Sequence, residues 1–227
     1  GILPERMRRL REHAAITVYT PGSTAGVPLD IVGSLRAPEG DWSTQAEVVR
    51  DEIEGFTSSL LGLVGIASDP LSSREHILVA NLIEHAWSSG VDLDLATLIG
   101  QIPTPPLRKL GVFDLDTFYP PKDRMALAMR LNGLIAAPAF SAWTSGPPLD
   151  VGAMLAPSDG RTRAAIVYLA HLSEEERQFV VTLVLSKAVT WLRGLPGTTS
   201  LRALLYMDEV FGFCPPSANP PAKKPIL

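Results

Sequence analysis

Residues 161–209 decide the fold of this chain: RTRAAIVYLAHLSEEERQFVVTLVLSKAVTWLRGLPGTTSLRALLYMDE. A continuous apolar run of strand length, 164–169, and a second apolar run of that length, 201–207, stand on either side of a helical segment. Ser173 and the three glutamates after it form a capping-box pattern at the start of that segment, and Gly194 closes it. Neither run alternates between polar and apolar residues, which is typical of parallel strands covered on both faces. The stretch therefore predicts a strand–helix–strand unit of a parallel sheet.

The earlier part of the chain predicts one more strand and a set of helices. Residues 15–19 are rich in β-branched side chains and end at the turn Pro21-Gly22-Ser23, as a strand does. Apolar residues at helical spacing then predict four helices. Two of them cover 48–63 and 121–137. A third runs from a capping box of Ser72 and Glu75 to Gly90, and a fourth covers 93–102 with Asp92 as a possible N-cap.

Together these elements predict an α/β fold, with a sheet that carries an all-helical insertion. We expect residues 1–44 to be a sheet-forming amino-terminal part and residues 45–145 to be the helical insertion. Residues 146–227 would then hold the strand–helix–strand unit.

Composition excludes several classes of protein. Of the 227 residues, 46% are hydrophobic and 19% are charged, which excludes wholesale disorder. The net charge of −4 excludes a compact basic nucleic-acid binder, although one local face could still be basic. Cys214 is the single cysteine, which excludes an internal disulfide and fits a reducing compartment. No signal peptide or membrane span is visible, so we expect a cytoplasmic protein without a membrane partner.

The segment 204–209, Leu-Leu-Tyr-Met-Asp-Glu, matches the Walker B pattern of four apolar residues followed by Asp-Glu. In an open α/β fold, the carboxyl end of a buried parallel strand opens into the crevice where ligands bind. There Asp208 can hold Mg²⁺ beside the phosphates of a nucleotide, and Glu209 can polarise the attacking water as a general base. The same pattern also arises where two acids merely solvate a strand end, so both interpretations stay open.

The phosphate-binding partner of a Walker B motif is missing from these residues. A P-loop needs a lysine directly after a glycine, and none of the five lysines follows one. Either the Walker B interpretation is wrong, or the P-loop precedes Gly1. The chain opens on glycine and closes on an apolar run, and we expect it to be an internal fragment of a longer protein.

The stretch 199–213, with the proline-rich residues 215–221 after it, resembles the bacterial HerA-like ATPases of the HerA/FtsK group of P-loop proteins. Four more segments resemble the same family in the same order: Val18–Ser23, Ser73–Leu78, Gly111–Leu115 and Ala170–Ser173. The resemblance therefore covers nearly the whole chain, from a point after the P-loop to just past Walker B.

The resemblance implies a partial RecA-like sheet from a motor ATPase that acts on DNA. The parent protein would bind ATP and Mg²⁺, form a homo-oligomeric ring of six copies, and work with a nuclease as a partner. On this basis Asp208 is the Mg²⁺-associated acid and Glu209 is the catalytic base. Because the P-loop is absent, we expect this chain to be inactive by itself.

Other polar residues have a functional and a structural interpretation. The pairs Asp92/Asp94 and Asp114/Asp116 can bind a divalent cation, but such acids more often cap helices. His171 follows a predicted strand end and could sense phosphate, or simply precede the Ser173 cap. Arg161 and Arg163 could stabilise phosphate charge in a neighbouring subunit, or form a surface pair.

A second function of another class also stays open, namely a non-catalytic helical module that docks onto a partner or onto its own copies. Exposed strand edges in a partial sheet pair readily with other chains. We therefore expect this chain to self-associate.

Overall fold

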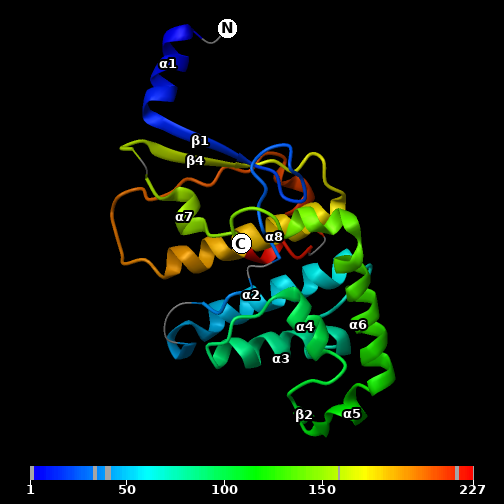
Figure 1. The fold of residues 1–227 in the computed structure, drawn as a ribbon. Helices are drawn as coiled ribbons and strands as arrows, with labels where there is room; N and C mark the ends of the chain where they lie inside the picture. The colour runs from blue at the N-terminus through cyan, green and yellow to red at the C-terminus, as the bar shows by residue number, and fades with distance from the viewer. Residues whose placement is uncertain (1–2, 33–34, 39–41, 158, 218–219, 227) are drawn as a thin grey trace.

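The computed structural model describes residues 3–32, 35–38, 42–157, 159–217 and 220–226. Its fold is mixed α/β, with many helices and a small parallel sheet (Figure 1). The strands are β1 (Ala14–Tyr19), β2 (Lys109–Leu110), β3 (Phe113–Asp114) and β4 (Thr162–Val167). The α-helices are α1 (Pro4–His13), α2 (Trp42–Leu63), α3 (Arg74–Ser88), α4 (Leu95–Gln101), α5 (Leu115–Phe118), α6 (Pro121–Ala136), α7 (Val151–Leu155), α8 (Glu174–Arg193) and α9 (Lys223–Ile226). Two 3₁₀ turns are η1 (Pro138–Trp143) and η2 (Val210–Gly212).

The parallel sheet joins two segments that lie far apart in the sequence. β1 pairs with β4 in parallel, from Ala14 opposite Thr162 to Tyr19 opposite Val167. All of the helices from α2 to α7 lie in the connection between these two strands. The strands predicted over 15–19 and 164–169 are thus confirmed, each displaced by one or two residues.

The third predicted strand is wrong. Residues 201–207 adopt no strand, and the partner of β4 is β1. The segment runs extended along the β4 side of the sheet (Figure 1), with Leu204 81% exposed and Tyr206 81% exposed. An apolar run becomes a strand only where a neighbouring strand accepts its backbone hydrogen bonds. Here no strand of the described residues does so, and the expected strand–helix–strand unit ends as strand–helix–extended chain.

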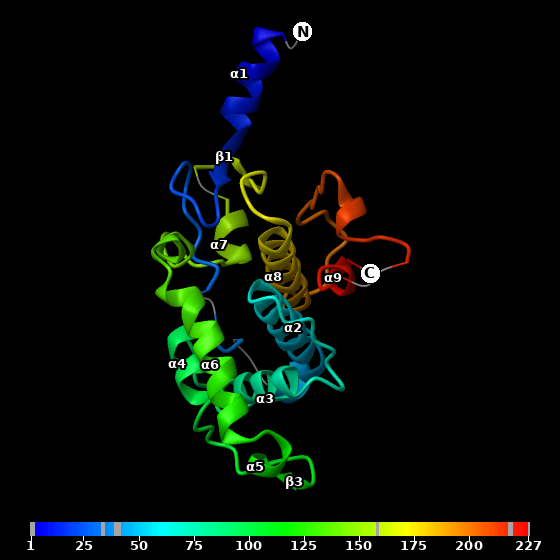
Figure 2. The ribbon, with the colours of Figure 1, turned by 90° about the vertical axis from the view of Figure 1, so that its right-hand side faces the viewer.

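The core lies between the helices below the sheet (Figure 2). α2 packs along α8 and also against α3. In the α2–α8 contact, the ring centroids of Phe56 and Phe179 lie 6.1 Å apart. Gly55 allows the close approach of α2 and α8, because a Cβ there would lie 3.2 Å from Thr182 Cγ2. The same helices hold many of the fully buried apolar side chains, among them Leu60, Leu61, Leu78, Leu82, Ile83 and Val180.

Two helix starts differ from the expectation. α3 begins after Ser73, and the hydroxyl of Ser72 donates instead to Asp69 Oδ1 at 2.8 Å, so the Ser72–Glu75 capping box is wrong. α4 begins after Asp94, whose carboxylate accepts from the Thr97 N–H at 2.6 Å. Either aspartate can cap the first turn on sequence grounds, and tertiary contacts choose between them. Asp92 accepts from the Ala37 N–H at 2.9 Å and ties a distant loop to this helix.

The other helix predictions hold. α6 matches its expected range to within one residue, and α2 ends at the expected residue 63 but begins six residues earlier than expected. The Ser173–Glu176 capping box forms in both directions at the start of α8. Gly90 adopts a φ of 68° just past α3, the left-handed backbone conformation that glycine tolerates best.

Candidate functional site at the carboxyl end of the parallel sheet

The carboxyl ends of β1 and β4 lie side by side and lead into two loops that contact each other. The Tyr168 N–H donates to the Tyr19 carbonyl at 2.9 Å, which extends the parallel pairing by one bond. Beyond it, His171 Nε2 lies 2.8 Å from the Pro21 carbonyl oxygen. Because a carbonyl only accepts, this contact requires the proton on Nε2. The sheet therefore presents one continuous rim at the end where open α/β folds bind ligands.

The turn after β1 is held by its own hydrogen bonds. Thr20 Oγ1 donates to the Ser23 carbonyl at 3.0 Å and accepts from the Gly26 N–H at 3.0 Å. Gly22 has a φ of 68°, and a Cβ on it would lie 2.6 Å from the Trp143 ring. Only glycine satisfies both conditions, so the turn is fixed by local chemistry and by the packing of Trp143.

His171 joins the two loops. Its ring stacks on Tyr168, with centroids 5.8 Å apart and an angle of 13° between the ring planes. With Nε2 donating to Pro21, the histidine links the β1 turn to the β4 loop, which favours the structural interpretation of this residue. Its Nδ1 remains the ring atom through which a ligand at the rim could be contacted.

Asp208 and Glu209 lie between two residues that contact α8, Met207 and Gly212. Met207 packs with Leu169 against Val181 and Leu185 of α8. Gln178 Nε2 of the same helix donates to the Gly212 carbonyl at 3.0 Å. The Gln178 contact holds η2 near the amino-terminal end of α8, which is the end closer in the chain to β4. The strand that was expected to deliver the two acids is absent, yet the segment still ends near α8.

Both acids are exposed. Glu209 has a φ of 53°, a left-handed conformation that is uncommon outside glycine, and its N–H donates to Asp208 Oδ1 at 3.1 Å. Non-glycine residues in this conformation gather at functional sites as well as at turns. Arg161, which could stabilise phosphate charge on sequence grounds, pairs with Asp159 at 3.0 Å. The described contacts do not link Arg161 to Asp208 or Glu209.

The described residues contain no group of three or more His, Cys, Asp or Glu side chains arranged to hold a metal ion. Asp208 and Glu209 offer carboxylate oxygens, which suit Mg²⁺, and a nucleotide phosphate and water would have to complete its shell. The Asp-x-Asp pairs serve other purposes. Asp92 and Asp94 accept backbone N–H groups, and Asp116 pairs with the buried Arg124 at 2.9 Å.

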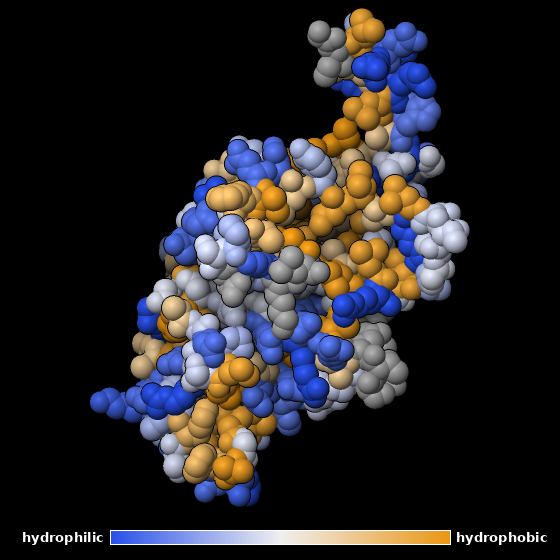
Figure 3. Space-filling model, turned by 180° about the vertical axis from the view of Figure 1, so that it is seen from behind, coloured by the Kyte–Doolittle hydropathy of each residue, from blue (hydrophilic) through white to orange (hydrophobic). Residues whose placement is uncertain are grey.

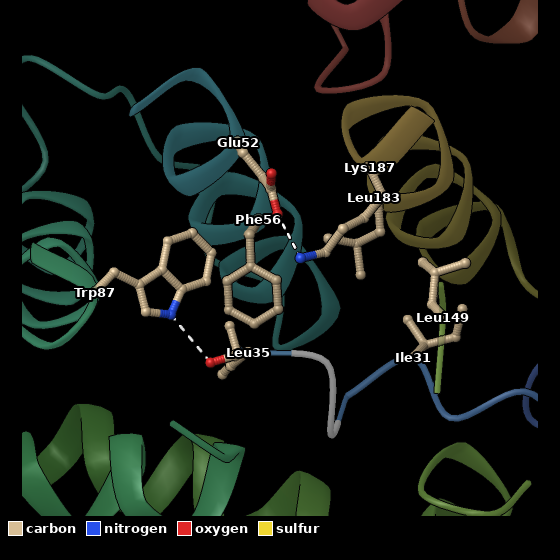
Figure 4. Close-up of a pocket in the computed structure, with 8 residues that line it drawn as sticks. All are labelled: Ile31, Leu35, Glu52, Phe56, Trp87, Leu149, Leu183 and Lys187. Carbon is tan, nitrogen blue, oxygen red and sulfur yellow. Dashed lines mark hydrogen bonds and ion pairs between the residues drawn. The ribbon is translucent and has the colours of Figure 1, made fainter. Parts of the chain in front are cut away.

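A buried ion pair between α2 and α8 was not predicted (Figure 4). Glu52 is 2% exposed, and its Oε1 lies 2.7 Å from Lys187 Nζ. Glu52 Oε2 accepts from Thr190 Oγ1 at 2.7 Å, and Lys187 Nζ lies 5.6 Å from the centroid of the Trp87 ring. Sequence offered no signal for this pair, because Glu and Lys on amphipathic helices usually face solvent.

The cavity beside this pair is too small for a ligand. Its volume is about 10 Å³, roughly what a single water requires, and Phe56, Leu149 and Leu183 close it. The Glu52–Lys187 pair is therefore a connection between two core helices.

A larger cavity of about 260 Å³ lies where α9 meets α2 and α8. Its polar wall carries Asp51, Ser186, Thr190 and Arg193, and its apolar wall comes from Pro221, Pro225 and Ile226. Its volume approaches that of a small-ligand pocket. Charges of both signs line it, so the lining selects no single ligand class.

Comparison with known proteins adds no relative to this description. The chain matches no family model, no curated protein and no solved structure. Among the described helices, none has the length and apolar character needed to cross a membrane.

Proposed function

We propose that this chain carries the Walker B part of a P-loop ATPase of the HerA-like kind, one that couples ATP hydrolysis to the translocation or processing of DNA. The observation that supports it best is the position of Asp208 and Glu209. Met207 before them and Gly212 after them both contact α8, the helix that follows β4. α8 begins after the carboxyl end of β4, and ligands of open α/β folds bind at the carboxyl ends of the parallel strands.

In this proposal the two acids have separate roles. Asp208 holds the Mg²⁺ that accompanies ATP, and Glu209 takes a proton from the attacking water. Their exposure leaves both carboxylates accessible to such a ligand. Mg²⁺ supplies charge neutralisation at the phosphates when it is bound. The phosphate cradle has to come from outside these 227 residues, and the chain alone is then inactive.

The proposal also implies partners. DNA is the substrate on which a HerA-like motor acts, and further copies of the chain would form its ring, with a nuclease as a possible companion. A RecA-like sheet further requires residues 201–207 to pair with the free edge of β4. That edge is open in the described structure, because β4 pairs only with β1.

ATP turnover by the protein encoded by the complete gene tests the proposal. We expect Glu209→Gln to lower kcat at least about 100-fold while ATP still binds, as loss of a general base does. Asp208→Asn should raise the Mg²⁺ concentration needed for half-maximal turnover, because it removes a carboxylate that holds the ion. Asp114→Asn and Glu47→Gln remove exposed acids elsewhere and should leave turnover unchanged. Full activity of Glu209→Gln, or no ATP turnover in the unaltered protein, would contradict the proposal.

One observation favours a second candidate, a non-catalytic interaction module. The segment 201–211 exposes several large apolar side chains, including Leu201 at 83% and Phe211 at 75%. Contiguous exposed apolar residues mark interaction surfaces. The same ATPase measurement separates the two candidates, because an interaction module would turn over no ATP.

A further inference from the structure

One face of the parallel sheet is apolar and uncovered. It carries Ile16 and Val18 from β1, and Ala164, Ile166 and Tyr168 from β4 and the residue after it. The four larger side chains are 42–50% exposed. Parallel sheets are normally covered on both faces, but here α7 and α8 lie on one side only (Figures 1 and 2). Figure 3 shows hydrophobic residues gathered in this upper part of the molecule, below α1.

Helix α1 and the residue before it carry an apolar stripe that none of the described residues covers. Leu3, Met7 and Leu10 lie within about 60° of one another around the helix axis, and they are 65%, 48% and 54% exposed. None of the ten residues of α1 is buried. β1 begins at Ala14, directly after α1 ends at His13, so no connecting residues remain to fold the helix back onto its own sheet. The helix therefore projects from the body (Figure 1).

We propose that two copies of this chain exchange α1, so that the helix of each copy covers the open sheet face of the other. The dimensions match. A ten-residue helix is about 15 Å long and about 10 Å wide. A six-residue strand is about 20 Å long, and two strands are about 10 Å across. Exchange of one element between identical chains closes as a twofold dimer, and each contact is then made twice.

The distribution of charge favours a second copy of this chain as the partner that covers the open sheet face. α1 carries four arginines and two glutamates, net +2, in a chain whose net charge is −4, so the other residues are net −6. Exposed acids follow the carboxyl end of β4 in the chain, namely Glu175, Asp208 and Glu209, while Glu174 is paired with Arg177. A basic helix is attracted to such a surface, which supports the exchange and makes it sensitive to salt.

Light scattering on the 227-residue chain tests the exchange. We expect a species of twice 24.4 kDa that dissociates on dilution and more readily at high salt. Met7→Glu should raise the dimer dissociation constant at least about tenfold, because it removes an apolar contact and adds an unfavourable charge. Ile166→Lys should do the same from the other side of the contact. Met125→Glu is the matched control, since Met125 is 49% exposed against 48% for Met7, and it should leave the constant unchanged.

A cross-link locates the contact. In a Cys214→Ser background, the double variant Met7→Cys, Ile166→Cys should form a disulfide between chains under mild oxidation, and Met125→Cys, Ile166→Cys should not. The proposal is overturned by a monomer at all concentrations, by a dimer that Met7→Glu leaves intact, or by failure of the cross-link in a dimer. A monomer that sediments with phosphatidylserine vesicles through α1 would also overturn it, because α1 would then be a membrane-surface helix.

Discussion

Lys187 Nζ of α8 lies 2.7 Å from Glu52 Oε1 of α2, and this pair crosses the main helix–helix contact of the core. The carboxylate is almost fully buried, and Thr190 satisfies its second oxygen (Figure 4). A buried charge is tolerated only while its partner remains.

We therefore expect Lys187→Ala to lower the free energy of unfolding by about 3–5 kcal/mol, because Glu52 would be left buried without a counter-charge. Urea unfolding followed by circular dichroism measures the loss. Arg50→Ala is the control, since it breaks a more exposed pair with Glu84 and should cost less than about 1 kcal/mol. Equal losses in the two variants would mean that the buried pair has no special weight. The double variant Glu52→Gln, Lys187→Met should recover part of the loss, because neither charge then remains.

His76 predicts a loss of stability in mild acid. Burial lowers the pKa of His76 below its usual 6.5, although the Glu54 carbonyl and the charges of Glu54 and Asp69 oppose the shift. The folded state thus disfavours the proton that the unfolded chain accepts. The contribution is fully present above pH 6.5 and is lost as the pH falls from there toward the lowered pKa.

The measurement is the midpoint of urea unfolding between pH 7.5 and pH 5. His76→Gln should flatten the fall in this range. His85→Gln, which changes an exposed histidine of the same helix, should leave it as it is. A slope that His76→Gln does not alter would assign the acid sensitivity to other groups.

Tyr119 predicts the opposite dependence at high pH. Burial, and next the charge of Glu75, raises the pKa of Tyr119 to about 12, while the unfolded chain ionises near 10. Stability from this residue is therefore present below pH 10 and declines as the pH rises toward 12. Absorbance at 295 nm should show one tyrosine titrating well after the others, and Tyr119→Phe should remove that step. Removal of the same step by Tyr206→Phe, at an 81% exposed position, would contradict the assignment.

Residues 201–207 should exchange their amide hydrogens quickly. In the described structure they form no strand, whereas β1 and β4 pair along six residues each. Hydrogen exchange by mass spectrometry should therefore protect peptides from 14–19 and 162–167 far more than those from 201–207. In the ATPase proposed above, added ATP and Mg²⁺ should protect 201–207 if Asp208 and Glu209 form a nucleotide site. Equal protection of all three segments without nucleotide would place 201–207 in a sheet already.

Most of the helices could be predicted from interactions between residues close together in the sequence. The capping box at Ser173, the glycine at position 90 and the helical spacing of α6 act over a few residues, so the sequence predicts them directly. The two-residue strands β2 and β3 were missed, because such short segments carry no periodic pattern.

The sequence by itself determined the approximate places of the longer helices, that β1 and β4 are strands, and that Asp208-Glu209 follows an apolar run. Tertiary structure alone decided which strands pair, which of two aspartates caps α4, and that Glu52 meets Lys187. The reason is physical. Caps and periodicity depend on neighbours within one or two turns. Strand pairing and buried ion pairs depend on edges and charges from distant parts of the chain, which an apolar run such as 201–207 cannot specify alone.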